Sequence, residues 1–410
     1  MSSHVLASNI LPSTKVVAST KVVASVLHGP KDLRKEERDL GPPGPGELRV
    51  VIHATGLCGS DLHYYNHFRN GDIVVREPLT LGHESFGIVV AMHPDLDTPT
   101  AMFQPGDRVA LEVGQPCQEC RCCKSGRYNI CANMVFRSSA RSFPHAQGTL
   151  QHAINHPAIY CHKLPLHVSY KLGALVEPLS VALHAVDRAN LSPREAVLVF
   201  GAGPVGLLCA AVTKATTPAA KVIIADIQAE RVKFAIENGF ADDGIVVPAG
   251  GPGGLEDVKV RLAFSKYVAD IVKESSIFVQ DYDDGEDDGP SGITATFECT
   301  GVESCMQAAI YATEAGGRIM IIGMGNPIQT LPIGAAALRE VDFIGVFRYR
   351  QGVYARAIEL LASNNPDLPN LERIVTHQFC GMDNVPAAFE MAGRVKDDDG
   401  KLVLKVVVRT

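Results

Sequence analysis

The sequence predicts an α/β protein in which a β-rich part precedes a doubly wound parallel sheet. Three observations carry this prediction. Short β-branched runs, broken by Gly and Pro, fill the chain up to about residue 165. From about residue 174, strand-like runs alternate with helical patterns, as in a parallel sheet wrapped by helices. The glycine turn FGAGPVG, at 200–206, joins the first of these strands to the first of these helices.

Length and composition suit an enzyme with more than one domain. The chain has 410 residues, of which 46 % are hydrophobic, and a net charge of −7. This acidic balance argues against a nucleic-acid-binding protein, which would carry a basic patch. No apolar run reaches the roughly 20 residues that a membrane helix needs, and the chain does not open with a signal-peptide pattern. We therefore expect a cytoplasmic protein whose partner is a small molecule, with no nucleic acid or membrane involved.

The change of pattern along the chain predicts three segments. Residues 1–173 form the first part of a β-rich catalytic domain, and 174–345 form the domain with the parallel sheet. Residues 346–410 return to the catalytic domain. The stretch 246–292 is rich in Gly, Asp and Pro and is longer than a compact core requires. We expect part of it to be a surface insertion.

The glycine turn has the spacing of a dinucleotide-binding loop. Gly201 makes the tight turn, Gly203 lets the backbone approach a pyrophosphate, and Gly206 packs the helix on the strand. Asp226 ends the next strand, where it would bind the ribose hydroxyls and repel a 2′-phosphate. An ordinary strand–helix turn uses glycines too, but this context favours NAD.

Five cysteines gather in CQECRCCKSGRYNIC, and four of them have the spacing of a metal site. Cys117, Cys120, Cys123 and Cys131 offer four thiolates from one loop. Such a set makes a closed tetrahedral zinc site, which leaves no position for substrate and is therefore structural. The charged residues between the cysteines indicate an exposed loop and argue against buried free thiols. Cys122 is supernumerary and competes with its neighbour as a ligand.

A second group of metal-ligating residue types occurs in CGSDLHYY and LGHESFG. Cys58 follows a strand, and His83 and Glu84 stand together before another strand. Three protein ligands of these types would leave a fourth zinc position open for water or substrate. Spacing alone leaves this site undecided, because a single histidine near a glycine is usually structural.

Taken together, these motifs resemble the zinc-dependent medium-chain dehydrogenases. More narrowly, they are similar to the polyol dehydrogenases that act on sorbitol, xylitol or L-arabinitol. The matching motifs run in order from about residue 22 to the end: C-G-S-D-x-H, G-H-E, P-G-D-R-V, the four-cysteine loop, E-P-L-S-V, G-A-G-P-V-G, E-C-T-G and R-E-V-D…G-V-F-R-Y. The resemblance implies a GroES-like, partly barrel-like β catalytic domain interrupted by a Rossmann domain. It also implies a catalytic zinc in the cleft between them and a homotetramer.

The resemblance assigns the catalytic zinc to Cys58, His83 and Glu84. Glu177 matches a further carboxylate, bound to zinc directly or through the zinc water. The other matched positions contact substrate or cofactor in the family. They are Tyr64, Glu177, Arg348 and Tyr349 for the polyol, and Gly201, Gly203, Pro204, Val205, Gly206, Asp226, Arg231, Ile322, Gly323, Met324, Val346, Phe347 and Arg348 for NAD.

Two residues beside Cys58 match supporting roles. Ser60 is placed like the family's hydroxyl that relays the proton outward, and Asp61 is a candidate partner that orients His83. Both residues would also suit the cap of a helix. The two interpretations are compatible.

These assignments predict an NAD-dependent enzyme that oxidises a secondary hydroxyl of a polyol to the ketose. Zinc would lower the pKa of the bound hydroxyl, and the alkoxide would transfer hydride to the nicotinamide. The chain departs from the family in FRSSARSFPHAQGTL and in RQGVY, which add Arg141 and Arg350 near the expected pocket. Two alternatives stay open. One is a medium-chain dehydrogenase for another small alcohol, such as a butanediol or an amino-acid-derived alcohol. The other is a silent relative that only binds NAD or zinc.

Overall fold

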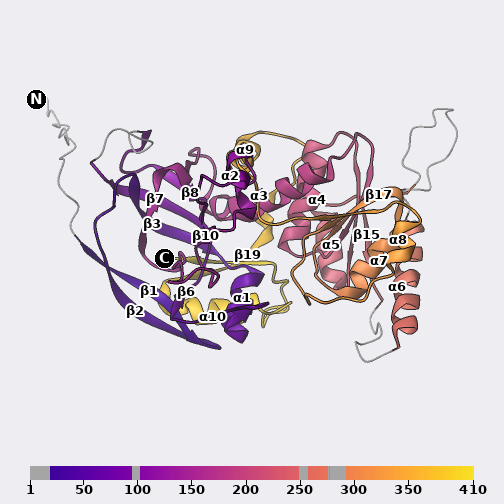
Figure 1. Cartoon of the computed structure of the whole chain (residues 1–410), viewed down its shortest axis with the longest axis horizontal. Coiled ribbons are helices and arrows are strands. Elements are labelled where there is room, and N and C mark those ends of the chain that lie inside the picture. Colours follow the sequence, from indigo (N-terminus) through magenta and orange to yellow (C-terminus); the bar gives the residue numbers. More distant parts are fainter. Residues whose placement is uncertain (1–18, 95–101, 249–256, 276, 278–291) are drawn as a thin grey trace, which may run out of the picture.

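The computed structural model describes residues 19–94, 102–248, 257–275, 277 and 292–410. The chain forms two lobes. The β-rich lobe contains the first and the last strands of the chain, and the other lobe contains the parallel sheet with its helices (Figure 1). The predicted α/β class is confirmed, because both sheet types occur in the expected order.

The β-rich lobe is built from short strands and three helices. Its strands are β1 (Thr20–Gly29), β2 (Asp32–Leu40), β3 (Glu47–Gly56), β4 (Arg69–Asn70), β5 (Ile73–Val74), β6 (Leu79–Thr80), β7 (Glu84–Met92), β8 (Arg108–Leu111), β9 (Gly114–Gln115), β10 (Val135–Phe136), β11 (Ala153–Pro157), β12 (Cys161–Lys163), β19 (Val375–Cys380) and β20 (Lys405–Arg409). Its helices are α1 (Gly59–His67), α2 (Arg121–Lys124) and α10 (Val385–Ala392), with 3-10 turns η2 (Tyr128–Ile130), η3 (Ala158–Tyr160), η5 (Leu371–Ile374) and η6 (Met382–Asn384). One sheet has the order β2-β1-β6, and the larger one has the order β12-β8-β7-β3-β20-β19, with β11 also paired to β3.

The C-terminal strand, β20, lies inside the large sheet and connects β19 to it. β20 lies between β3 and β19, and its residues Val407 and Val408 pair antiparallel with Gly56 and Thr55 at the end of β3. All but the last of its residues are buried. The end of the chain therefore lies beside the loop that leads from β3 into α1.

The second lobe is a six-stranded parallel sheet with the order β15-β14-β13-β16-β17-β18. Its strands are β13 (Ala196–Phe200), β14 (Lys221–Asp226), β15 (Asp243–Val246), β16 (Ile293–Glu298), β17 (Thr313–Ile321) and β18 (Asp342–Gly345). Its helices are α4 (Pro204–Thr216), α5 (Ala229–Glu237), α6 (Val258–Lys273), α7 (Glu303–Ala312) and α8 (Ile333–Ala337). The order reverses between β13 and β16, as in a Rossmann sheet. This confirms the predicted doubly wound sheet.

The turn after β13 requires its glycines. Gly201 has a φ of +96°, a conformation that favours glycine. A Cβ on Gly206 would stand 1.8 Å from the carbonyl oxygen of Gly201. The turn is therefore as tight as its spacing predicts.

Helix α3 (Tyr170–Ala189) joins the two lobes, and α9 (Val353–Ala362) packs near it. Its buried side chains share one apolar core with Phe86 of β7, Val199 of β13 and Leu207 of α4. Ser169 caps the helix, because its hydroxyl accepts the N–H of Leu172 at 3.3 Å. The placement of α3 thus fixes Glu177 relative to both sheets.

Helix α6 lies within the stretch that we expected to be an insertion. It packs on α7 at the outer side of the parallel sheet (Figure 1), and Val268, Ala269 and Val272 are buried in the core there. The expectation that a compact core does not need this stretch is wrong for 258–273. The flanking residues are rich in Gly and Asp, but 258–273 carry a helical apolar face that packs in the core. Residues 249–256 and 278–291 lie outside the described residues.

Two substitutions on α6 test its place in the core. Val268→Asp buries a carboxylate at a side chain that is 2 % exposed, so we expect it to lower the free energy of unfolding by about 3 kcal/mol. Val260→Asp makes the same change on the same helix, but Val260 is 49 % exposed, and the effect should stay within about 0.5 kcal/mol. Urea denaturation measures both. Equal effects would show that α6 is not a core element.

Candidate active site

Three potential metal ligands meet where β3 ends and β7 begins. Cys58 precedes α1, His83 precedes β7, and Glu84 is the first residue of β7. One ligand atom from each lies within 4.8 Å of the other two. The register of the sheet causes this, because Glu84 pairs with Gly56 at the end of β3. A Cβ on Gly56 would stand 2.3 Å from an oxygen of Glu84, so a side chain at this position would displace that carboxylate.

Asp61 orients this group through four contacts. Its Oδ1 lies 3.3 Å from Nδ1 of His83 and accepts the hydroxyl of Ser138 at 2.6 Å and the N–H of Gly82 at 3.1 Å. Its Oδ2 accepts the N–H of Cys58 at 3.2 Å. Asp61 thus both caps α1 and holds the ring of His83, which leaves Nε2 for a metal.

The contacts of Asp61 and His83 determine the charges of these two side chains. Burial opposes ionisation of Asp61, but His83 and the hydrogen bonds outweigh it and lower the pKa of the carboxyl. Burial likewise opposes a charge on His83, yet Asp61 raises the pKa of the imidazole well above its usual value. In the metal-free protein the ring therefore holds a proton, which it must lose when a metal binds to it.

Lys405 is a site residue that the sequence analysis missed. Its Nζ donates to both carboxylate oxygens of Glu84 at 2.8 Å and to the carbonyl of Leu57 at 3.0 Å. Burial lowers the pKa of Lys405, but Glu84 more than offsets this, so the ammonium stays charged. A lysine that opens an apolar strand normally faces solvent. Only the position of β20 beside β3 reveals its role.

Glu177 of α3 lies beside the same group. It is 5 % exposed, and burial raises the pKa of its carboxyl to about 7. Among nearby charges, Glu84 adds to this rise, whereas His83, Lys405 and Arg348 oppose it. The carboxyl can therefore gain or lose a proton near neutral pH.

The residues expected to contact the polyol are largely buried. Tyr64 and Tyr349 are 3 % and 2 % exposed, and the hydroxyl of Tyr349 has no hydrogen-bond partner among the described residues. The guanidinium of Arg348 lies 3.6 Å from the ring centre of Phe136, and that ring lies 5.6 Å from the ring of His83. Burial lowers the pKa of Arg348 to about 10.

The two added arginines differ in their surroundings. Arg350 forms an ion pair with Asp187 of α3 at 3.1 Å, and half of its side chain is exposed. Arg141 is exposed, and its charge acts on Arg348. Arg350 therefore contacts the joining helix, and Arg141 lies nearer the expected pocket. Ser60 is half-buried in the first turn of α1.

The expected NAD contacts lie along one edge of the parallel sheet. The turn with Gly201 follows β13, Asp226 ends β14, and the remaining positions follow β17 and β18 or lie on α4 and α5: Pro204, Val205, Arg231, Ile322, Gly323, Met324, Val346 and Phe347. Asp226 accepts the N–H groups of Ala202 at 2.7 Å and Gln228 at 2.8 Å. Ligands of doubly wound sheets bind at this carboxyl edge.

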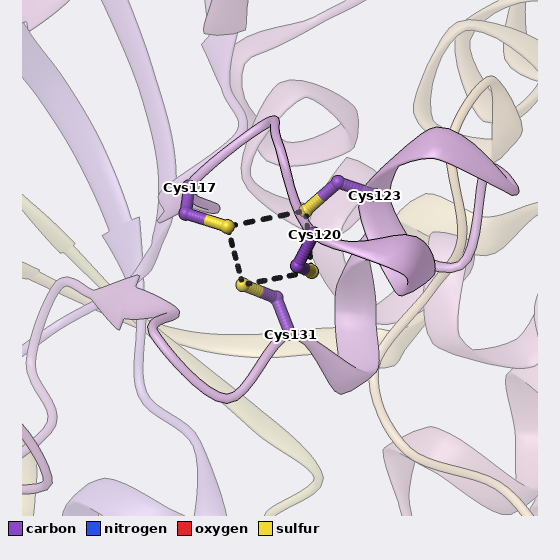
Figure 2. Close-up of side chains that lie close together, drawn as sticks. All are labelled: Cys117, Cys120, Cys123 and Cys131. Atoms are coloured by element: carbon purple, nitrogen blue, oxygen red, sulfur yellow. Dashed lines mark hydrogen bonds between the residues drawn. The ribbon is translucent and has the colours of Figure 1, made fainter.

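The four-cysteine loop has the dimensions of a zinc–thiolate site. Figure 2 shows the sulfurs of Cys117, Cys120, Cys123 and Cys131 facing one another, with successive separations of 3.5 to 3.9 Å. A tetrahedron with zinc–sulfur bonds of about 2.3 Å has edges of about 3.8 Å. The sulfur of Cys122 does not belong to this group.

Comparison with known proteins identifies the family. The alcohol dehydrogenase GroES-like domain matches residues 44–166, and the zinc-binding dehydrogenase domain matches 204–363. The fold and the candidate site are thus those of a zinc-binding dehydrogenase.

Similar proteins narrow this class. Sorbitol dehydrogenase from Bos taurus is 38 % identical over 94 % of this chain and 95 % of its own length. The enzyme of that name from Homo sapiens is 37 % identical over 86 % and 88 %. Among solved structures, L-idonate 5-dehydrogenase from Escherichia coli has a TM-score of 0.76 at 24 % identity, covering 96 % of this chain and 99 % of its own. The chain belongs to the zinc-dependent medium-chain dehydrogenases, in the branch of the sorbitol dehydrogenases. Within the described residues, we find no helix that is long and apolar enough to cross a membrane.

Replacing a loop cysteine tests the structural zinc site. Cys117→Ala removes one of four ligands, so we expect a loss of about one zinc per chain and of more than about 2 kcal/mol of stability. Cys122→Ala, on the same loop, should keep its zinc. Elemental analysis and thermal unfolding measure these changes. Unchanged zinc in Cys117→Ala would rule the site out.

The raised pKa of Glu177 predicts that the stability of the protein, after a chelator has removed its metal, depends on pH. Folding favours the protonated carboxyl, so its contribution is present below the unfolded pKa, near 4.5, and is lost as the pH rises through about 7. Glu177→Gln should therefore stabilise the metal-free protein at pH 8, by about 2 kcal/mol, and change little at pH 4.5. Glu359→Gln, at an exposed position, is the control. A pH-independent difference would contradict the prediction.

Proposed function

We propose that this protein oxidises a secondary hydroxyl of a polyol of the sorbitol, xylitol or L-arabinitol type to the ketose, with NAD as hydride acceptor. The observation that carries the proposal is the group of half-buried Cys58 and buried His83 and Glu84, with Glu177 beside it. Its three ligand types leave an open zinc position. The 38 % identity with the sorbitol dehydrogenase from Bos taurus, over 94 % of this chain, supports the substrate class.

The side chains around the group suit this reaction. When held by Cys58, His83 and Glu84, zinc supplies the Lewis acidity that lowers the pKa of a substrate hydroxyl. Asp61 keeps the ring of His83 in place. Glu177, with a pKa of about 7, can hold a proton near the reacting hydroxyl at neutral pH. We assign Ser60 as the relay that carries the proton outward.

The pocket residues favour a hydrated, oxygen-rich substrate. Tyr64, Arg348 and Tyr349 bring hydrogen-bonding groups to the region of Glu177, and the buried hydroxyl of Tyr349 lacks a partner in the described part of the chain. A buried polar group without a partner is rare in a protein, so a bound polyol hydroxyl would satisfy it. An apolar alcohol would not.

The cofactor site favours NAD over NADP. Asp226 is 9 % exposed and already lies against the glycine turn through the N–H of Ala202. A 2′-phosphate on the ribose would stand close to this carboxylate and be repelled. The turn provides the approach for the pyrophosphate.

A dehydrogenase for another small alcohol is the alternative. The 2R,3R-butanediol dehydrogenase from Bacillus subtilis has a TM-score of 0.73 at 25 % identity, over 95 % of this chain and 99 % of its own. The loop at 136–150 departs from the polyol dehydrogenases, and its Ser138 reaches Asp61 beside the metal ligands. The substrate preference is therefore the point to test.

We also propose a homotetramer in the cytoplasm. Strand β18 is an edge of the parallel sheet, and apolar side chains near it are exposed, among them Ile333, Leu338 and Phe343. Such an edge is suited to pairing with a second copy. None of the eleven cysteines forms a disulfide, which is typical of a reducing compartment.

A substrate panel with a metal count tests the proposed function. We expect NADH formation with one or more four- to six-carbon polyols and about two zincs per chain. Cys58→Ala should lose about one zinc and at least about a hundredfold in kcat, since it removes a ligand. Cys380→Ala, at an exposed cysteine, is the control. NADH formation with butanediol alone would favour the alternative, and no NADH with any alcohol would indicate a silent relative.

A further inference from the structure

The four-cysteine loop contacts the segment that carries the expected substrate residues. We call Phe347–Gln351 the substrate segment. The side-chain amide of Asn129 donates to the carbonyl of Phe347 at 2.8 Å, and the N–H of Gln351 donates to the carbonyl of Gly126 at 3.0 Å. Both loop residues lie between Cys123 and Cys131. The loop therefore holds the substrate segment at its two ends.

The substrate segment needs such support. Arg348 has a φ of +51°, a left-handed conformation that costs free energy in a residue other than glycine. Its guanidinium stacks on Phe136, which in turn lies against the ring of His83. Tyr349, the next residue, is buried. A shift of this backbone would therefore move both side chains relative to the metal ligands.

The side chain of Asn129 is used for the hydrogen bond to Phe347. It is 5 % exposed, and within the described residues its Oδ1 has no hydrogen-bond partner. The bond to Phe347 is thus the one side-chain hydrogen bond that we find for Asn129 in the described part of the chain. It joins residues 218 positions apart in the sequence.

The loop has little regular structure of its own. Between its second and last cysteine it holds only α2, of four residues, and η2, of three residues. Helices this short are not stable by themselves. Tyr128 anchors η2 through a hydrogen bond from its hydroxyl to Glu112. The four sulfurs, which face one another across the loop, add a further constraint when a metal joins them (Figure 2).

We propose that the four-cysteine loop positions the substrate segment, with Asn129 as the positioning residue. The metal at the four thiolates would hold the stretch from Cys123 to Cys131 in shape. That stretch then sets the backbone of Phe347–Gln351, and with it Arg348 and Tyr349. The roles of those two side chains rest on the proposed function, whereas the contacts of the loop do not.

A nearly isosteric pair of variants tests the proposal in the full-length, zinc-loaded enzyme. Asn129→Asp replaces the amide donor with a carboxylate, which cannot donate to the carbonyl of Phe347 and is repelled by it. We expect the KM for the polyol and the Kd for NADH to rise about five- to tenfold, with kcat within about twofold and both zincs retained. Asn133→Asp makes the same change at an exposed residue just after the loop and should alter neither constant.

Further measurements separate positioning from stability. Asn129→Ala removes the donor without adding a charge and should raise the same constants. Cys117→Ala, which loses the loop metal, should raise them too. In Asn129→Asp, Asn129→Ala and Cys117→Ala, amide hydrogen exchange in 347–351 should be faster than in the parent enzyme.

The contrary outcomes are equally defined. A fall in melting temperature with unchanged KM, Kd and hydrogen exchange would reduce the loop to a structural staple and overturn the proposal. If the parent enzyme oxidises no polyol, the proposed function fails, and the Kd for NADH and the hydrogen exchange still decide whether the loop positions the segment.

Discussion

The buried ion pair between Lys405 and Glu84 is the constraint on which the site depends. Removing both charges from water is costly, and it is tolerated only where each charge finds its full set of partners. Here the ammonium reaches both oxygens of Glu84 and the carbonyl of Leu57. The pair therefore requires β20 to lie beside the end of β3, and it ties the C-terminus of the chain to the metal ligands.

Charge balance at this point explains the choice of residues around it. The buried carboxyls of Asp61, Glu84 and Glu177 lie close together, and Lys405 and His83 compensate part of their charge. A divalent cation at Cys58, His83 and Glu84 would supply more. Burial is the main cause of the near-neutral pKa of Glu177, and we propose that this carboxyl faces the substrate.

The two groups of potential metal ligands differ in the number of ligands that they offer. A metal at the cysteine loop would be closed off by four thiolates, whereas one at Cys58, His83 and Glu84 would keep a position open for substrate. They are nevertheless connected, because the loop holds the substrate segment and Arg348 of that segment reaches the ring of His83 through Phe136. A structural metal can thus influence a reaction without touching the substrate.

The sequence alone determined the features whose physics is local. The turn at Gly201–Gly206 and the loop at Cys117–Cys131 each depend on spacings of a few residues, so their patterns predicted the doubly wound sheet and a metal loop. Tertiary structure decided the contacts between distant residues. Lys405 meets Glu84 321 positions away, and Asn129 meets Phe347 218 positions away, which no local pattern can encode. Helix α6 likewise became a core element only through packing on α7, because burial depends on what a helix face meets and not on its own residues alone.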